Sequence, residues 1–249
     1  MKSLNRIALA LACAFAFPHA ASADIINCRS LPDYSALKPA LDAAVATETS
    51  GLDFQMWATL VDRDGIVCAV AFSGADRGSQ WPGSRVISAQ KANTANAFSL
   101  NGLSLSTANL YSAVQPGGSL FGLQLSNPVD TTAAYQGPSS NYGKANDPLV
   151  GQKIGGVNVF GGGLALYDEF GRVVGAVGLS GDTSCADHMI AWRVRNNLHL
   201  DHLHGKGVAS DPDRPDNIIY DITDGASAGG FGHPTCINTG DEKLLPAVQ

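Results

Sequence analysis

The stretch LVDRDGIV, residues 60–67, has a near match in LYDEFGRV, residues 166–173. Each has an apolar run, a short turn that contains Asp and Gly, and a second apolar run that continues to a Ser-Gly pair. This pattern is typical of a β-hairpin, because Asp side chains cap tight turns and Gly adopts backbone angles that other residues avoid. The sequence therefore predicts two antiparallel hairpins.

Helical patterns flank these hairpins. Apolar side chains recur at i, i+4 and i+8 in residues 34–47, and residues 84–99 carry alanines spaced three apart, a small-residue face that another element can approach closely. Residues 184–198 open with a capping box, Ser-Cys-Ala-Asp, and continue as an apolar stripe. Strands joined by tight turns cannot be parallel. We therefore predict an α+β fold, with an antiparallel sheet from two β-hairpins and flanking helices.

The N-terminus has the features of an export signal. Lys2 and Arg6 precede an apolar run over residues 7–17, and the small residues Ala21-Ser22-Ala23 follow it. The run is too short to span a bilayer, and small residues at this position suit a signal peptidase. We predict that residues 1–23 are a signal peptide and that the mature chain is periplasmic or secreted.

Length and charge narrow the possible functions. About 226 residues remain after this cut, which suits a single core with extensions. Loss of Lys2 and Arg6 makes the formal net charge of -6 more negative. A negatively charged protein is repelled by the phosphates of nucleic acids, so nucleic acid is not an expected partner. No later stretch holds about eighteen consecutive apolar residues, so we expect no membrane anchor.

The cysteines suggest two disulfides. Cys13 would leave with the signal, and Cys28, Cys68, Cys185 and Cys236 would remain, an even number in an oxidising compartment. Three pairings are possible and the sequence does not choose among them. We favour Cys28–Cys68 and Cys185–Cys236, in which each irregular terminal segment is joined to a patterned one. A metal site is the alternative, but the cysteines lack the C-x-x-C spacing typical of zinc.

Two segments do not fit the regular pattern. Residues 115–156 are rich in Gly, Pro, Ser and Asn, and a structureless loop of that length is uncommon inside a domain, so they form either a binding flap or a surface insertion. Residues 199–249 are also polar and rich in Gly and Pro. We therefore predict one domain over residues 24–198 with an insertion at about 115–156, and an irregular C-terminal extension.

Four motifs in order resemble the GlcG/HbpS family of haem-binding proteins, whose fold also forms the C-terminal part of PduO-type proteins. They lie at residues 61–65 (VDRDG), 88–95 (SAQKANTA), 161–163 (GGG) and 171–181 (GRVVGAVGLSG). The resemblance covers about residues 34–198. It implies a profilin-like fold, frequent homo-oligomers, and binding of haem or a related tetrapyrrole; secreted members are linked to haem sensing, haem storage and iron handling.

The resemblance and the signal peptide together favour an exported haem-binding protein. We expect its site to include Arg85, Lys91, Thr94, Tyr111, Gly161, Gly162 and His188. Haem needs an apolar slot, one or two axial donors and cations for its propionates. Arg85 and Lys91 can supply the cations, although two solvated helix charges are the alternative interpretation. The glycines would form the floor, and His188 is a candidate axial ligand.

Two other functions remain open. Asp187 and His188 are neighbours at the start of a helix and can form a proton-transfer pair, so a small-molecule enzyme with residues 115–156 as its lid is one alternative. An accessory or structural oligomeric subunit is another. The sequence contains no P-loop and no serine nucleophile elbow.

The start of the C-terminal extension holds a short histidine cluster. His199, His202 and His204 lie close enough in sequence to bind a borderline metal ion together. Histidine clusters in solvated tails also bind metals adventitiously, so the sequence gives a candidate metal site and no more.

Overall fold

The computed structural model describes residues 28–249, so the predicted signal peptide lies outside the described residues. A four-stranded antiparallel sheet with the order β2-β1-β4-β3 forms the centre of the protein. The strands are β1 (Trp57–Asp62), β2 (Val67–Phe72), β3 (Gly163–Tyr167) and β4 (Val173–Ser180). Both predicted hairpins are therefore confirmed. They share one sheet because β1 pairs with β4, from Trp57 opposite Ser180 to Asp62 opposite Gly175.

The turns of the two hairpins are built in the same way. Gly65 and Gly171 have φ values of 77° and 68°, in the region that favours glycine. The side chains of Asp62 and Asp168 each accept hydrogen bonds from the backbone N–H groups two and four residues later. The Asp-to-Gly spacing in the sequence therefore specifies both turns.

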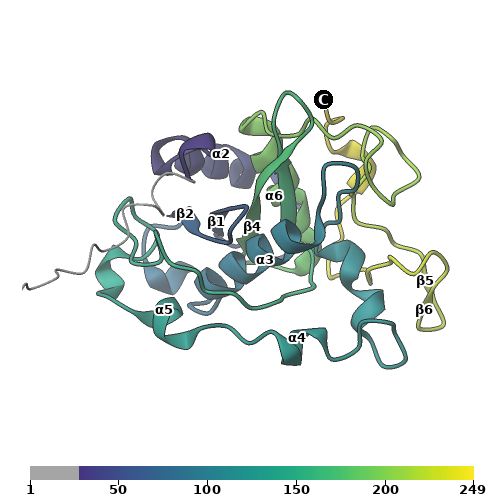
Figure 1. Cartoon of the computed structure of the whole chain (residues 1–249), viewed down its shortest axis with the longest axis horizontal. Coiled ribbons are helices and arrows are strands. Elements are labelled where there is room, and N and C mark those ends of the chain that lie inside the picture. The colour runs from purple at the N-terminus through teal and green to yellow at the C-terminus, as the bar shows by residue number, and fades with distance from the viewer. Residues whose placement is uncertain (1–27) are drawn as a thin grey trace, which may run out of the picture.

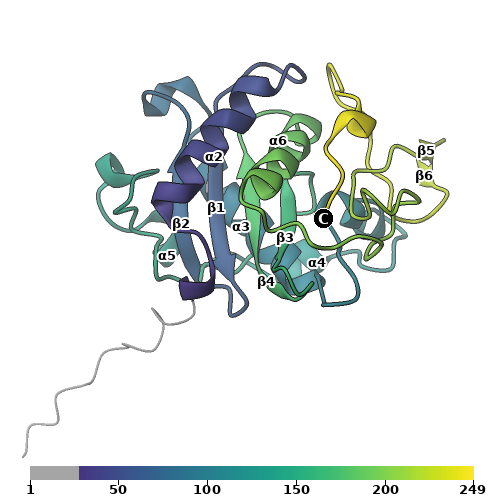
Figure 2. The same ribbon diagram turned by 90° about the horizontal axis from the view of Figure 1, so that it is seen from above.

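Helices cover both faces of the sheet (Figure 1). On one face lie α2 (Tyr34–Thr47) and α6 (Ser184–Asn197), side by side across the strands (Figure 2). On the other face lies α3 (Ser84–Phe98). The helices begin where the sequence predicts them, and the α+β architecture is confirmed. Asp33 and Thr183 cap α2 and α6, which satisfies backbone N–H groups that each helix start leaves free.

The small-residue face of α3 packs directly on the sheet. A Cβ at Gly178 in β4 would lie 2.0 Å from the backbone oxygen of Ser88 and 2.4 Å from the nitrogen of Ala92. The helix therefore approaches the strand as closely as backbone atoms allow, and only glycine fits at this crossing.

The 115–156 insertion is not an open flap. It contains α4 (Leu123–Ser126) and α5 (Thr131–Tyr135), and it runs along the outer side of α3 (Figure 1). Ala133 and Ala134 of α5 are buried in the same apolar cluster as the alanines of α3. The insertion thus adds a further layer to this face of the protein.

The C-terminal extension lies beside α6 and β3 (Figure 2). Its regular structure is a two-stranded ribbon of β5 (Ile222–Thr223) and β6 (Ala226–Ser227). Short 3-10 helices connect the main elements: η1 (Cys28–Ser30), η2 (Arg77–Ser79), η3 (Ala108–Leu110), η4 (Ser112–Val114), η5 (Ser139–Asn141) and η6 (Glu242–Leu244). No helix within residues 28–249 combines the length and the apolar character that crossing a membrane requires.

Two disulfides join the ends of the chain to the core. Cys28 bonds to Cys68 in β2, and Cys236 of the extension bonds to Cys185 in the first turn of α6. This is the pairing that we favoured among the three possible ones.

The tight crossing of α3 over β4 gives a first prediction. We expect Gly178→Ala to lower the free energy of unfolding by about 1–3 kcal/mol, because the added methyl group overlaps the backbone of α3. Gly83→Ala is the matched control, since a Cβ there meets nothing within 4 Å and the backbone is already helical; its effect should stay within about 0.5 kcal/mol. Urea denaturation measures both, and equal effects would contradict the packing argument.

Candidate functional site

The middle of α3, the glycine run before β3 and the first turn of α6 meet around one buried ion pair. The Lys91 ammonium donates to Asp187 at 2.6 Å, and both side chains are almost fully buried. The other carboxylate oxygen of Asp187 accepts hydrogen bonds from the backbone of Gly181 and Asp182, just after β4. Burial raises the pKa of Asp187 to about 6, and the Lys91 charge opposes this shift. Lys91 is therefore neither a solvated helix charge nor free to meet a propionate.

The glycine run is a crowded crossing and not a floor for a ligand. A Cβ at Gly161 would lie 2.2 Å from the backbone oxygen of Ser184, and one at Gly162 would lie 2.5 Å from that of Leu179. Gly162 also has a φ of 116°. These glycines allow the chain to pass between α6 and the sheet.

Arg85 anchors the insertion. Its guanidinium pairs with the buried carboxylate of Asp147, donates to the backbone oxygen of Ala134 at 2.9 Å, and lies 3.6 Å from the ring centroid of Tyr142. All three partners belong to residues 115–156. The interpretation of Arg85 as a solvated helix charge is therefore wrong, and in this structure the side chain is fully occupied.

Thr94 fixes the segment that leads into the glycine run. Its hydroxyl donates to the backbone oxygen of Gln90 at 2.8 Å and accepts from the backbone nitrogen of Asn158 at 2.9 Å. The side chain has no exposed surface. It therefore positions backbone and does not face a ligand.

His188 is closed off by the C-terminal extension. Its ring has no exposed surface, and its Nε2 lies 3.1 Å from the backbone nitrogen of Ile218 and 3.2 Å from Oδ1 of Asn217. Burial lowers the pKa of His188 to about 3, so the imidazole is neutral. A substrate cannot reach this ring in the described structure, and the neighbouring Asp187 is held by Lys91. The structure therefore does not support a proton-transfer pair that acts on a small molecule.

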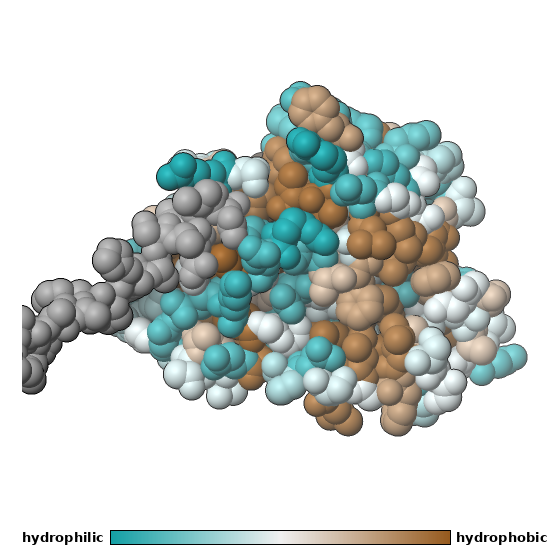
Figure 3. Space-filling model, in the orientation of Figure 1, coloured by the Kyte–Doolittle hydropathy of each residue, from teal (hydrophilic) through white to brown (hydrophobic). Residues whose placement is uncertain are grey.

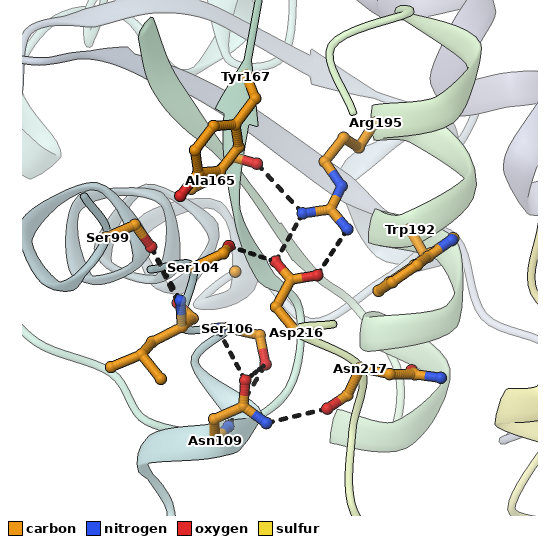
Figure 4. Close-up of polar contacts among 12 residues, drawn as sticks. Ser99, Ser104, Ser106, Asn109, Ala165, Tyr167, Trp192, Arg195, Asp216 and Asn217 are labelled. Carbon is orange, nitrogen blue, oxygen red and sulfur yellow. Dashed lines mark hydrogen bonds and ion pairs between the residues drawn. The ribbon is translucent and has the colours of Figure 1, made fainter. Parts of the chain in front are cut away.

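A third buried ion pair holds the extension in place (Figure 4). Arg195 of α6 donates to both carboxylate oxygens of Asp216, at 2.7 and 2.8 Å, and the hydroxyl of Ser104 donates to the same carboxylate at 2.6 Å. None of the three has more than a trace of exposed surface. Burial alone would raise the pKa of Asp216, but the Arg195 charge and these hydrogen bonds hold it below its usual value. Sequence analysis missed this pair.

The structure does not bring the three histidines at the start of the extension together as one group of ligand atoms. His204 is exposed and lies 3.1 Å from a carboxylate oxygen of Asp213, and His199 is exposed as well. Within residues 28–249, the groups whose potential ligand atoms all lie within 4.8 Å of one another do not include His199, His202 or His204. The metal site at these histidines stays a prediction from the sequence.

Tyr111 differs from the other predicted site residues because it lines an open hollow of about 630 Å³. One wall comes from residues 111–119 and the other from residues 222–234 of the extension. The ring of Tyr111 lies 5.1 Å from that of His233, which is buried and whose pKa burial lowers to about 4. Of the glycine-rich run at residues 229–232, only Gly230 lines this second wall, so no local sequence pattern marks it.

The sequence model of the family described as "Haem degrading protein HbpS-like" matches residues 34–195, about two thirds of the chain. The chain belongs to the HbpS-like family. The resemblance found in the motifs is therefore confirmed. The match includes the insertion and ends at Arg195. We call the matched residues 34–195 the HbpS-like core. The ion pair of Arg195 with Asp216 therefore joins this core to a segment outside the match.

Solved structures with a similar chain include the protein ORFY of Klebsiella pneumoniae and a PduOC:haem complex. The first is 26% identical, with 67% of this chain and 90% of that chain covered and a TM-score of 0.43. The second is 22% identical, with 66% and 90% covered and a TM-score of 0.46. No curated protein matches this HbpS-like chain.

The buried pair between the HbpS-like core and the extension gives a second prediction. We expect Asp216→Asn to lower the free energy of unfolding by about 3–5 kcal/mol, because it leaves the Arg195 charge buried without a counter-charge. Asp42→Asn is the control, since its pair with Lys38 is partly exposed and should contribute no more than about 1 kcal/mol. Urea denaturation measures both variants. A similar loss in the free energy of unfolding for the two would contradict a stabilising role of the buried Asp216 carboxylate.

The buried imidazole of His188 gives a third prediction. The unfolded chain binds a proton near the usual histidine pKa of about 6.5, whereas folded His188 binds one only near 3, so stability falls as the pH drops below about 6.5. Between pH 7 and 5 this should cost about 2 kcal/mol. His188→Gln removes this contribution and leaves the opposite contribution of Asp187 in place. Unfolding at both pH values should show the smaller loss in the variant; equal losses would contradict the burial of a neutral ring.

Proposed function

We propose that this protein is an exported haem-binding or tetrapyrrole-binding protein. The observation that carries the proposal is the match of residues 34–195 to the family described as "Haem degrading protein HbpS-like". The predicted signal peptide and the two disulfides support a location outside the cytoplasm, in the periplasm or the medium. A role in haem sensing, haem storage or iron handling is part of this proposal.

The cleft expected from the sequence does not fit a haem as the structure stands. Arg85 and Lys91 are each neutralised by a buried aspartate, and the glycines meet backbone atoms of their neighbours. His188 lies beneath the extension. A flat macrocycle would have to displace all these contacts to reach this position.

The hollow beside Tyr111 fits better. Its size lies within the range of small-molecule sites, and its walls are mainly glycine, alanine, serine and proline, which let a flat ligand approach the backbone. Tyr111 would supply the oxygen donor, since a tyrosine can ligate haem iron. No Lys or Arg is among the lining residues, so binding would depend on contact with the ring plane more than on charge pairing.

We propose binding and not turnover at this hollow. Its lining residues include no Asp, Glu, His, Cys, Lys or Arg, the side chains that most often move protons in enzymes. Bound haem would bring its own redox chemistry, and the protein would hold and orient it.

A homo-oligomer is also part of the proposal. Apolar side chains gather in places on one face of the protein (Figure 3). Leu125 of α4 and Phe121, two residues before α4, have exposed fractions of 86% and 65%. Isolated apolar residues are common on protein surfaces, but two large ones so close in the chain suit a contact between subunits.

Haemin titration of the purified protein tests the proposed function. We expect a shifted Soret band at stoichiometric haemin, and about tenfold weaker binding by Tyr111→Phe, because the phenyl ring keeps the wall but removes the oxygen donor. Tyr135→Phe is the control, since Tyr135 is exposed elsewhere on the insertion. A spectrum of free haem with the unaltered protein would overturn haem binding. An unchanged spectrum in Tyr111→Phe, with a changed one in His188→Gln, would instead place the haem in the covered cleft.

A further inference from the structure

The two disulfides lie in opposite electrostatic surroundings. We propose that Cys185–Cys236 is a redox-active bond, opened by a dithiol reductant, whereas Cys28–Cys68 is a permanent cross-link. This inference does not depend on haem binding, because it rests on the groups around the sulfur atoms.

The sulfur atoms of Cys185–Cys236 lie at the start of a long helix. Cys185 is the second residue of α6, which has 14 residues and Thr183 as its N-cap. The backbone N–H of Cys185 points to the sulfur of Cys236 at 3.2 Å, and the hydroxyl of Ser184 lies 3.6 Å from the same atom. A helix N-terminus favours negative charge and lowers thiol pKa values. The reduced form of this bond is therefore stabilised.

A buried imidazole adds to this effect. One ring nitrogen of His233 lies within 4.8 Å of both sulfur atoms. Nδ1 of His233 is 2.7 Å from the backbone oxygen of Pro234, so it carries the proton, and Nε2 has no hydrogen-bond partner although only 1% of the residue is exposed. An acceptor without a partner can take the S–H of a released thiol. The nearby carboxylate of Asp187 is already neutralised by Lys91.

The surroundings of Cys28–Cys68 favour the oxidised form. A carboxylate oxygen of Asp62 lies within 4.8 Å of both sulfur atoms, and Asp62 is 98% buried with Oδ2 unpartnered. A buried carboxylate repels a thiolate, as any two like charges do. Cys68 lies in a strand and Cys28 in a single 3-10 turn, so no long helix offsets this repulsion.

The exchange step follows from access to the two sulfurs. Cys185 is fully buried and Cys236 is half-buried, so a thiolate of the dithiol attacks the sulfur of Cys236. The disulfide breaks and Cys185 leaves as a thiolate at the start of α6. The second thiol of the reductant then attacks the mixed disulfide and releases Cys236. The protein gains two electrons and two protons, and the reductant becomes a disulfide.

Opening this bond loosens one wall of the hollow beside Tyr111. Pro234, which lines the hollow, is two residues from Cys236. Without the disulfide, the segment before Cys236 keeps hydrogen bonds from the backbone N–H of His233 to the oxygen of Ile219 at 2.8 Å and from the hydroxyl of Ser112 to the oxygen of Gly232 at 2.6 Å. Beyond Cys236, Asn238 stays hydrogen-bonded to the backbone of residues 49 and 51. We therefore infer that reduction mobilises about residues 226–236, while Asn238 stays in place and Asp216 stays bound to Arg195. Reduction would then release bound haem, and this last consequence is the part of the inference that rests on the proposed function.

A redox titration without haem tests the inference. The protein is equilibrated with increasing ratios of reduced to oxidised dithiothreitol, free thiols are trapped by alkylation, and each cysteine peptide is quantified by mass spectrometry. We expect Cys185–Cys236 to open at a ratio at least about tenfold lower than Cys28–Cys68. Opening of both bonds at one ratio, or of Cys28–Cys68 first, would overturn the proposal even if haem binds well.

Variants show whether the charge of Asp62 and the imidazole of His233 set the ease of reduction, or whether access of the reductant to the sulfur atoms sets it. Asp62→Asn should bring the opening ratio of Cys28–Cys68 closer to that of Cys185–Cys236, and His233→Asn should raise the ratio of Cys185–Cys236 only. Hydrogen exchange over residues 226–236 should rise on reduction of the unaltered protein and of a Cys28→Ser/Cys68→Ser variant. In a Cys185→Ser/Cys236→Ser variant it should be high from the start and unaffected by reductant. An increase confined to residues 28–68 would refute the inference.

Discussion

A charge that leaves water must find a partner, and in this protein that requirement fixes how the parts of the chain are joined. Lys91 and Asp187 join the two helices on opposite faces of the sheet. The other two buried pairs each tie an irregular segment to a helix: Arg85 with Asp147 for the insertion, and Arg195 with Asp216 for the extension. Burying an ion pair gains little by itself, but separating it inside the protein is costly. These pairs therefore select one arrangement of the helices, the insertion and the extension more than they raise the total stability of the fold.

Sequence reasoning succeeded where the signal is local. Turn chemistry at Asp62 and Asp168, apolar periodicity and helix caps depend on residues a few positions apart, and they gave the hairpins and the long helices. It failed where a side chain meets a distant one. A cation on α3 looks the same whether it faces water or a carboxylate, and Arg85 finds its partner 62 residues later. No periodic pattern marks Asp147 or Asp216.

The family match and the structure together change where a ligand site is to be sought. One motif that carries the resemblance forms the turn between β1 and β2, and the other three contribute to the close crossings of helices and sheet. They therefore specify the fold of the HbpS-like core. The accessible surface next to Tyr111 combines that core with residues 222–234, which lie outside the match. Chains of this family without such an extension would lack that wall. Function can thus differ among members that share one fold.

The strand order β2-β1-β4-β3 has a kinetic consequence. The central neighbours β1 and β4 are separated by more than a hundred residues, and pairing over so large a loop is slow. As the polypeptide emerges from the ribosome, the hydrogen-bonding edge of β1 therefore stays vacant until residue 180 has been made. A vacant edge invites association with other nascent chains. Keeping this edge apart from other chains until β4 can pair with it is the requirement that this topology imposes.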